Sequence, residues 1–195
     1  MPLNITTEKI KRADDFAAFK HEGQIRKDAS KNPYIVHPRE VAWILQLCGI
    51  KDEDIICAAL LHDTIEDTHT TPEELIQHFG EKVCQLVLEC SHDKALSKVE
   101  RKRSELEHVQ HISVDALLIK AADKISNIQS ETPKSWSPAV KLGYVQWSFR
   151  YCERVKGLNA KMDTLLTWVF DEYGIESVSD ADLDVYYEEL NRSRK

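Results

Sequence analysis

The sequence predicts an all-α fold in a single domain that spans residues 1–195. Six glycines and six prolines among 195 residues leave few positions that interrupt a helix. Apolar residues recur at intervals of three and four, and helix-capping signals precede several of these stretches. No segment shows the strict alternation of apolar and polar residues that marks a half-buried strand, and no linker divides the chain.

A helix is expected to begin at His37-Pro38 and to end before Gly49, because proline is favoured at the first helical position and glycine after the last. After Asp52, residues 55–61 are almost entirely apolar. A surface helix needs a polar face, so this segment is predicted to form a buried central helix.

Thr71 and Pro72 predict the next helix start, because threonine accepts hydrogen bonds from the first backbone amides and proline follows it directly. Gly80 is expected to end this helix. The apolar positions between residues 83 and 90 have helical spacing, which predicts an amphipathic helix.

The second half of the chain continues the helical pattern. Residues 112–128 carry apolar side chains on most faces and are predicted to be largely buried. Ser137 is expected to cap a helix that extends to about Val155, and an apolar stripe over residues 158–170 predicts another. The charged segment 180–195 is interpreted as a C-terminal surface helix.

Composition argues against several classes of protein. With 26 basic and 33 acidic residues the net charge is −7, which disfavours a nucleic-acid binder because that task needs a basic surface. No apolar run is long enough to span a membrane and the N-terminus lacks a signal-peptide pattern, so a cytoplasmic protein is expected. The cysteines form no C-x-x-C pair and are expected to be buried thiols. They are Cys48, Cys57, Cys84, Cys90 and Cys152.

Four polar residues follow the apolar segment 55–61, where burial is predicted. His62 lies four residues before Glu66. Asp63 and Asp67 have the same spacing, so a continuing helix would place all four side chains on one side. Three neighbouring carboxylates repel one another unless positive charge lies among them. We therefore predict that a divalent metal ion binds here.

Two further polar residues interrupt apolar surroundings. His37 stands at an expected helix start, and Asp123 lies in the segment IKAADKI, four residues before Asn127. Together with His62 and Asp63 they give two imidazoles and two carboxylates, a set that suits manganese, iron, nickel or zinc better than calcium or magnesium. Water bound to such an ion becomes a nucleophile near neutral pH.

Each of these residues also has a purely structural explanation. His37 could satisfy its ring at a helix start, and Asp123 could pair with Lys120 or Lys124. Glu66-Asp67 could be a pair of solvated loop acids. Only the coincidence of the histidines with the acids favours a metal site over these explanations.

The pattern His37 … His62-Asp63 … Asp123 resembles the HD superfamily of metal-dependent phosphohydrolases. More narrowly, the chain is similar to the hydrolase domain of RelA/SpoT-type alarmone enzymes in its free-standing form, the small alarmone hydrolases. The resemblance covers residues 8–175. It rests on the segments RKDASKNPYIVHPREVAWIL (26–45), AALLHDTIEDTHTT (58–71), FGEKV (79–83), ERKR (100–103) and IKAADKISNI (119–128).

The resemblance implies an HD-type helical domain with one Mn²⁺ between its central helices. The implied metal ligands are His37, His62, Asp63 and Asp123. Glu66 and Asp67 would position and activate the attacking water. The residues implied to contact the substrate, a small nucleotide, are Arg26, Lys27, Lys98, Arg101, Lys102, Asn127 and Tyr144. The implied reaction removes the 3′-pyrophosphate of ppGpp or pppGpp and yields GDP or GTP.

Elementary chemistry supports part of this substrate assignment. A polyphosphate needs cations, and residues 97–105 form the densest basic run of an acidic chain. The same run could instead be a solvated helix face, and Arg26-Lys27 could be no more than a charged loop. Tyr144 could be a core residue that shares helical spacing with Val140 and Trp147.

Two departures from the family pattern concern the pocket. Residues 91–94, Ser-His-Asp-Lys, stand where long family members have a Thr-Lys pair, and His92-Asp93 is interpreted as a surface pair because no acids follow four residues later. Ala121 and Ser126 replace the family's usual Leu and Tyr or His around Asp123. The implied metal ligands are unchanged, so these departures bear on pocket shape and base preference.

Two alternatives to the main interpretation remain open at this stage. The same site could act on pppApp or on the 2′-phosphate of NADPH, because base contacts and pocket walls select the substrate. The chain could also be a helical module that binds a nucleotide without turnover. Glu66-Asp67 argues against that module, since binding alone needs no additional acids.

Overall fold

The computed structural model describes residues 7–28, 31–92, 94–130 and 132–192, and the prediction of an all-α fold is confirmed for them. Extended pairing within these residues is limited to an isolated antiparallel bridge between Ile25 and Pro33. The helices are α1 (Glu8–Lys20), α2 (Val36–Leu47), α3 (Glu53–Leu61), α4 (Thr64–Asp67), α5 (Pro72–Phe79), α6 (Glu81–Cys90), α7 (Lys98–His108), α8 (Val114–Gln129), α9 (Pro138–Cys152), the 3₁₀ turn η1 (Glu153–Val155), α10 (Ala160–Asp171) and α11 (Asp180–Arg192).

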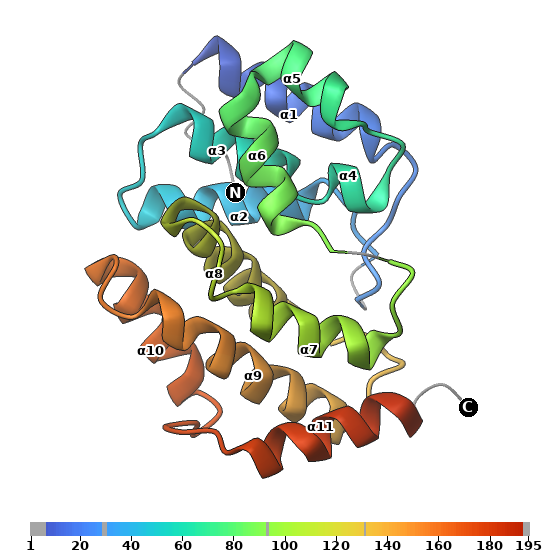
Figure 1. The fold of residues 1–195 in the computed structure, drawn as a ribbon, viewed down its shortest axis with the longest axis vertical. Helices are drawn as coiled ribbons and strands as arrows, with labels where there is room; N and C mark the ends of the chain where they lie inside the picture. Colours follow the sequence, from blue (N-terminus) through green and yellow to red (C-terminus); the bar gives the residue numbers. More distant parts are fainter. Residues whose placement is uncertain (1–6, 29–30, 93, 131, 193–195) are drawn as a thin grey trace.

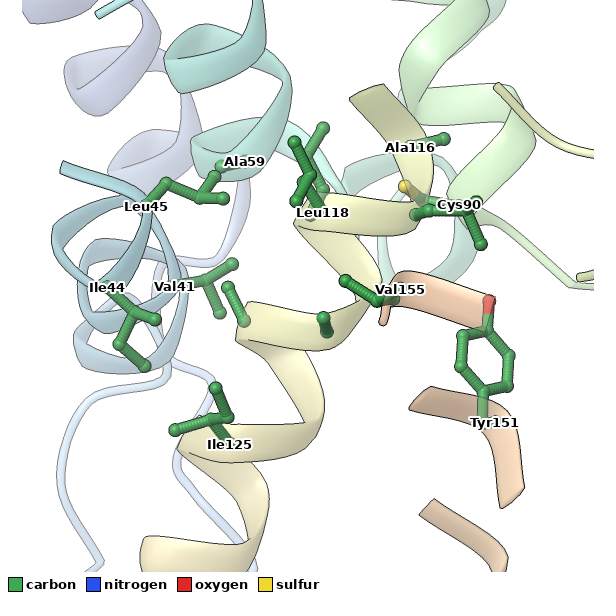
Figure 2. Packing of buried hydrophobic residues seen from close by; sticks show 14 of the residues in the cluster. Val41, Ile44, Leu45, Ala59, Cys90, Ala116, Leu118, Ile125, Tyr151 and Val155 are labelled. Carbon is green, nitrogen blue, oxygen red and sulfur yellow. The ribbon is translucent and has the colours of Figure 1, made fainter. Parts of the chain in front are cut away.

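Helix α8 is the central element of the fold, with α2, α3 and α6 on one side and α9, η1 and α10 on the other (Figure 1). Figure 2 shows Val41 of α2 and Tyr151 of α9 on opposite sides of α8, which contributes Leu118 and Ile125 to the core. Because α8 is enclosed on most faces, four polar residues that it carries are buried as well, namely Lys120, Asp123, Lys124 and Ser126. The predicted burial of this segment is confirmed.

Side-chain caps begin several of the predicted helices. Asp52 accepts hydrogen bonds from the amides of Asp54 and Ile55 at the start of α3. Thr71 and Ser137 each accept a hydrogen bond from the amide three residues later, and a proline follows each of them. The helix starts predicted at these two residues are confirmed. Each cap gives a hydrogen-bond acceptor to a backbone amide that has no partner inside the helix.

Two N-terminal features differ from the prediction. Helix α2 begins at Val36 rather than at Pro38, because Ile35 already has helical backbone angles. Helix α1 was not predicted at all. Its buried face consists of Ile10 and the small residues Ala13 and Ala17, together with Asp14, so its apolar periodicity is weak.

The chain does not continue as one helix from residue 55 to Asp67. Helix α3 ends at Leu61, His62 and Asp63 form a turn, and the short helix α4 follows. The hydroxyl of Thr64 donates a 2.7 Å hydrogen bond to the carbonyl of Leu61, which satisfies an acceptor at the end of α3. A continuing helix, the condition under which spacing alone would place the four polar side chains on one side, is therefore not what the structure shows.

Helix α11 is the surface helix interpreted from the sequence over its described residues, and it packs one face against α9 and α7. Leu183, Tyr186, Tyr187 and Leu190 are buried in this contact, while the acidic residues of the helix face outward. These four positions have helical spacing, which the high charge of the segment obscures. Residues 193–195 of the predicted segment lie outside the described residues.

The five cysteines are buried and none of them forms a disulfide, as the sequence predicts. Burial raises the pKa of Cys90 and of Cys152 to about 12 each, so both remain protonated and act as small apolar side chains. None of the described helices combines the length and the apolar character needed to cross a membrane.

Candidate active site

Three chain segments bring two histidines and two aspartates together. His37 comes from the first turn of α2, and His62 and Asp63 form the turn after α3. Asp123 comes from the middle of α8. His37, His62 and Asp123 are buried, and each offers a ligand atom within 4.8 Å of the other two.

The fourth residue, Asp63, lies beside this group of three. Its Oδ2 is 3.1 Å from His62 Nε2 and 3.7 Å from His37 Nε2. Asp123 Oδ1 lies 3.2 Å from His37 Nε2 and 4.0 Å from His62 Nε2. Adjacent ligands bonded at about 2.0–2.2 Å to one ion lie about 3 Å apart, so these spacings fit a single metal ion.

The Nδ1 atom of each imidazole already has a hydrogen-bond partner. His62 Nδ1 lies 2.7 Å from the carbonyl oxygen of Ala59, so it donates a proton there. Ser126 donates to Glu40 at 2.8 Å, and its oxygen can therefore accept from His37 Nδ1 at 2.9 Å. Both rings then present an unprotonated Nε2 to the aspartates, the state in which histidine binds a metal. Among the described residues, His62 Nε2 has no hydrogen-bond partner.

The electrostatics of the cluster favour positive charge at its centre. Burial works against a charged His62, yet the Asp63 and Asp123 carboxylates overcome this effect and raise the pKa of His62. Burial lowers the pKa of His37 and keeps that ring neutral. Burial also opposes charge on Asp123, but Lys124 and Lys120 lower the pKa of this carboxyl well below its usual range. The donor set therefore fits a divalent transition metal.

Tyr34 joins the cluster to the acids of α4 and was not predicted as a site residue. Its hydroxyl lies 2.6 Å from Asp63 Oδ2 and 3.3 Å from Asp67 Oδ2. Burial and the charge of Asp63 raise the pKa of Tyr34, so the hydroxyl stays protonated and donates. The ring is held in place against His21, with 4.8 Å between ring centroids.

Glu66 and Asp67 lie on α4, directly after the turn that carries His62 and Asp63. Glu66 Oε2 accepts a 3.3 Å hydrogen bond from the amide of His92, and its Oε1 lies 3.8 Å from Arg101 Nη1. Burial raises the pKa of Glu66, and the charge of Asp63 adds to this effect. Asp67 pairs with Lys94. The two acids are thus half-buried groups with defined partners rather than solvated loop acids.

His92 is not the surface residue that the sequence suggested. Its side chain is only 11% exposed, and its Nε2 lies 3.6 Å from the buried carboxylate of Glu105. The segment that contains it folds back against Glu66, which explains the burial. Asp93, the second member of the predicted surface pair, lies outside the described residues.

A cavity of about 710 Å³ adjoins the cluster. Tyr34, Asp67 and Asn127 line it. Two of these residues contact implied metal ligands: the hydroxyl of Tyr34 donates to Asp63 Oδ2, and Asn127 Nδ2 donates a 2.6 Å hydrogen bond to Asp123 Oδ1. The cavity is rich in cations, which come from the 26–28 segment, α7 and α9. The basic residues that line it are Arg26, Lys27, Lys98, Arg101, Lys102 and Lys141.

All seven residues implied to contact the substrate therefore lie on the wall of one cavity. Arg26 is fixed by hydrogen bonds to Ser130 Oγ at 2.6 Å and to Asn127 Oδ1 at 3.4 Å, whereas Lys27 is exposed. Tyr144 is only 7% exposed, so it is both a core residue and part of the wall. Trp136, which was not predicted, lies next to it with 5.2 Å between ring centroids.

The sequence analysis did not assign four residues of this site, which are Tyr34, Ser126, Trp136 and Lys141. Tyr34 stands in the segment PYIVH, three residues before His37, and proximity to a candidate ligand could have marked it. Ser126 appeared only as a departure from the family pattern, although its hydroxyl orients His37. Trp136 and Lys141 carry no local signal, because only the fold brings them to the cavity.

Comparisons with known proteins agree with this geometry. The family model described as "HD domain" matches residues 13–141. The "Guanosine-3′,5′-bis(diphosphate) 3′-pyrophosphohydrolase MESH1" proteins of Xenopus tropicalis and Homo sapiens are 45% and 42% identical to this chain. These alignments cover 85% and 86% of this chain and 95% and 96% of the relatives.

A solved structure described as a metazoan ortholog of SpoT that hydrolyzes ppGpp superposes with a TM-score of 0.82 at 37% identity. The superposition covers 88% of this chain and 98% of that structure. The fold and the length of the matching region agree with these relatives. The chain belongs to the HD domain family and, within it, to the group of the MESH1 proteins.

Proposed function

We propose that this protein is a Mn²⁺-dependent hydrolase that removes the 3′-pyrophosphate from ppGpp or pppGpp. The observation that carries the proposal is the cluster of two histidines and two aspartates beside a cavity lined with cations and aromatic rings. The relatives named for guanosine-3′,5′-bis(diphosphate) 3′-pyrophosphohydrolase activity support the same substrate.

The metal is proposed to be held by the Nε2 atoms of His37 and His62 and by one carboxylate oxygen each of Asp63 and Asp123. This mixed nitrogen and oxygen set suits manganese, iron, nickel or zinc, and the resemblance to the small alarmone hydrolases favours manganese among them. When bound, the cation supplies Lewis acidity, which lowers the pKa of water and draws charge from a phosphoryl oxygen. The hydrogen bonds of the two Nδ1 atoms keep the rings in the orientation that this binding needs.

Glu66 and Asp67 are proposed to hold the attacking water and accept its proton. A carboxylate whose pKa is raised toward neutrality exchanges protons more readily at physiological pH, and Glu66 has a raised pKa because of its burial. Asp67 shares the hydroxyl of Tyr34 with Asp63, so its carboxylate is held next to the metal ligands. The water oxygen then forms a bond to phosphorus, the bond from phosphorus to the ribose 3′ oxygen breaks, and that oxygen leaves with a proton as a 3′-hydroxyl.

The cations of the cavity are proposed to bind the two diphosphate groups. Lys98, Arg101 and Lys102 lie on α7, and Arg101 approaches Glu66, so this helix flanks the proposed water site. Arg26 and Lys27 face the cavity from the opposite segment. Tyr144 adds an aromatic wall that suits the planar base. Neutralising the phosphates within an acidic protein requires such a local concentration of positive charge.

The decisive experiment offers ppGpp, pppApp and NADPH in parallel to the purified protein with Mn²⁺. The proposal expects ppGpp to be cleaved to GDP and pyrophosphate at least as efficiently as the other two nucleotides. Preferred cleavage of pppApp or of the NADPH 2′-phosphate would reassign the substrate while keeping the metal chemistry. Tight nucleotide binding without turnover of any of the three would contradict the assignment as an enzyme.

A further inference from the structure

A buried carboxylate on α7 connects the wall of the cavity with the metal cluster. Glu105 is 3% exposed, and three nitrogen atoms surround it. Lys102 Nζ lies 3.0 Å from Oε1, while Lys124 Nζ and His92 Nε2 lie 3.8 Å and 3.6 Å from Oε2. No site residue was predicted at this position.

The charges continue from Glu105 to an implied metal ligand. Lys124 Nζ lies 2.9 Å from Asp123 Oδ2, and Lys120 Nζ lies 3.7 Å from the same atom. Lys120 also donates a 3.1 Å hydrogen bond to the carbonyl of Cys90. An unbroken run of alternating charges, Lys102–Glu105–Lys124–Asp123, therefore extends from the cavity to the metal cluster.

Lys102 is the member of this run that faces the cavity. Its Nζ lies 3.8 Å from the ring centroid of Trp147 and 5.6 Å from that of Tyr144. Burial among these rings lowers the pKa of Lys102 to about 8, and Glu105 opposes that shift. The other charged groups that act on it are Lys124 and Lys120, whose like charges disfavour its protonated form.

Stability alone does not explain this arrangement. A buried ion pair pays a large desolvation cost, and well-packed apolar residues in its place are often as stable or more stable. The arrangement joins three lysines with two carboxylates, and one of these lysines, Lys102, lines the cavity. A cation held at that position has a use where a polyanion binds.

We propose that Glu105 is a positioning residue, which holds Lys102 as an oriented cation for the diphosphate groups of the substrate. The inference rests on the proposed function for the identity of the polyanion, but it concerns a residue that does not touch the substrate.

The test compares Glu105→Gln with Glu107→Gln, an exposed glutamate of the same helix. In Glu105→Gln the KM for ppGpp is expected to rise about tenfold with a smaller change in kcat, because one oriented cation is lost from binding. The alkaline limb of the pH profile of 1/KM is expected to move to lower pH, since Lys102 then loses its proton more easily. Glu105→Asp is expected to recover part of the affinity, and Glu107→Gln to behave as the wild type.

Calorimetric titration measures the affinity for inorganic pyrophosphate, and the metal content is checked before and after. Because this measurement needs no turnover, it separates the inference from the proposed function. If the wild type does not cleave ppGpp but Glu105→Gln weakens pyrophosphate binding, the proposed function fails and the role of Glu105 stands. A lower melting temperature together with wild-type KM and pyrophosphate affinity would show a purely structural role and overturn the inference.

An unpaired Lys102 can by itself prevent folding, so a second comparison uses Lys102→Met with and without Glu105→Gln. The double variant removes both charges and is expected to bind pyrophosphate as weakly as Lys102→Met alone, because Glu105 acts through Lys102. A further loss of affinity in the double variant would show that Glu105 acts by another route, and would contradict the inference.

Discussion

The hydroxyl of Tyr34 donates a 2.6 Å hydrogen bond to Asp63 Oδ2, and it lies 3.3 Å from Asp67 Oδ2. One side chain thus connects an implied metal ligand to one of the two acids proposed to handle water. Groups that orient a metal ligand in this way typically contribute 10- to 100-fold to metal affinity or activity.

Tyr34→Phe removes this hydroxyl and leaves the ring, which packs against His21. We expect the affinity for Mn²⁺ and the kcat for ppGpp each to fall by about 10- to 100-fold, while the melting temperature of the metal-free protein changes little. Metal titration and steady-state kinetics measure the two effects. Wild-type values of both would show that the hydrogen bond to Asp63 has no functional role.

Glu66→Gln together with Asp67→Asn tests the proposed water-handling acids. Because the amides cannot accept a proton from water, kcat is expected to fall by at least about 100-fold, in the range typical of a lost general base. Metal content should remain close to one ion per chain, since neither residue is an implied ligand. Elemental analysis and turnover assays are the measurements, and persistent turnover would exclude a catalytic role for this pair.

Asp123→Ala tests the metal cluster through stability. A ligand that binds only the folded state stabilises it by mass action, by about 2.7 kcal/mol at a concentration 100 times its dissociation constant. Added MnCl₂ is therefore expected to raise the denaturation midpoint of the wild type but not that of Asp123→Ala. The variant also leaves Lys120 and Lys124 without their shared carboxylate, so it should be less stable than the wild type even in a chelator.

The sequence was informative wherever a local pattern decides the structure. The caps at Asp52, Thr71 and Ser137 and the apolar segment before His62 follow from short-range physics. The turn at His62-Asp63 could not be predicted, because apolar residues and acids alone do not show that the Leu61 carbonyl pairs with a hydroxyl.

Contacts between distant segments account for most of the remaining differences. Ser126 orients His37 across 89 positions of the chain, and Glu105 is buried although it lies in a run of charges that resembles a solvated helix face. Charged residues become buried here because their partners on α8 are buried too. Such pairings depend on how helices pack, which composition and spacing do not reveal.

His92 makes stability depend on pH in a defined direction. Burial, followed by the charge of Lys120, lowers the pKa of His92 to about 3 in the folded chain, below its ordinary value of 6.5. Between these two values the unfolded chain binds the additional proton, so the free energy of unfolding falls as pH decreases through 6.5 toward 3. One such group contributes a slope of at most about 1.4 kcal/mol per pH unit.

Chemical denaturation of His92→Gln and wild type between pH 7 and 5, both with a chelator, is expected to show a shallower decline for the variant. His111→Gln, at an exposed histidine, serves as the control. Parallel declines for His92→Gln and the wild type would mean that His92 is already accessible to protons in the folded state.

Gly143 on α9 lies directly against Tyr186 of α11. A Cβ atom at Gly143 would lie 2.5 Å from Cδ2 and 2.8 Å from Cβ and Cγ of Tyr186, so α11 would have to shift. Alanine is about 1 kcal/mol better than glycine inside a helix, yet overpacking of this kind costs about 1–3 kcal/mol, and we expect a net loss of stability. Because Tyr186 and Leu190 of α11 line the cavity, the KM for ppGpp is expected to rise as well.

Chemical denaturation and steady-state kinetics of Gly143→Ala measure both effects. In a Tyr186→Ala background, which lacks Cγ and Cδ2, the same substitution should lower the free energy of unfolding by less. A stable Gly143→Ala variant with unchanged KM would contradict the docking of α11 against α9 and its contribution to the wall of the cavity.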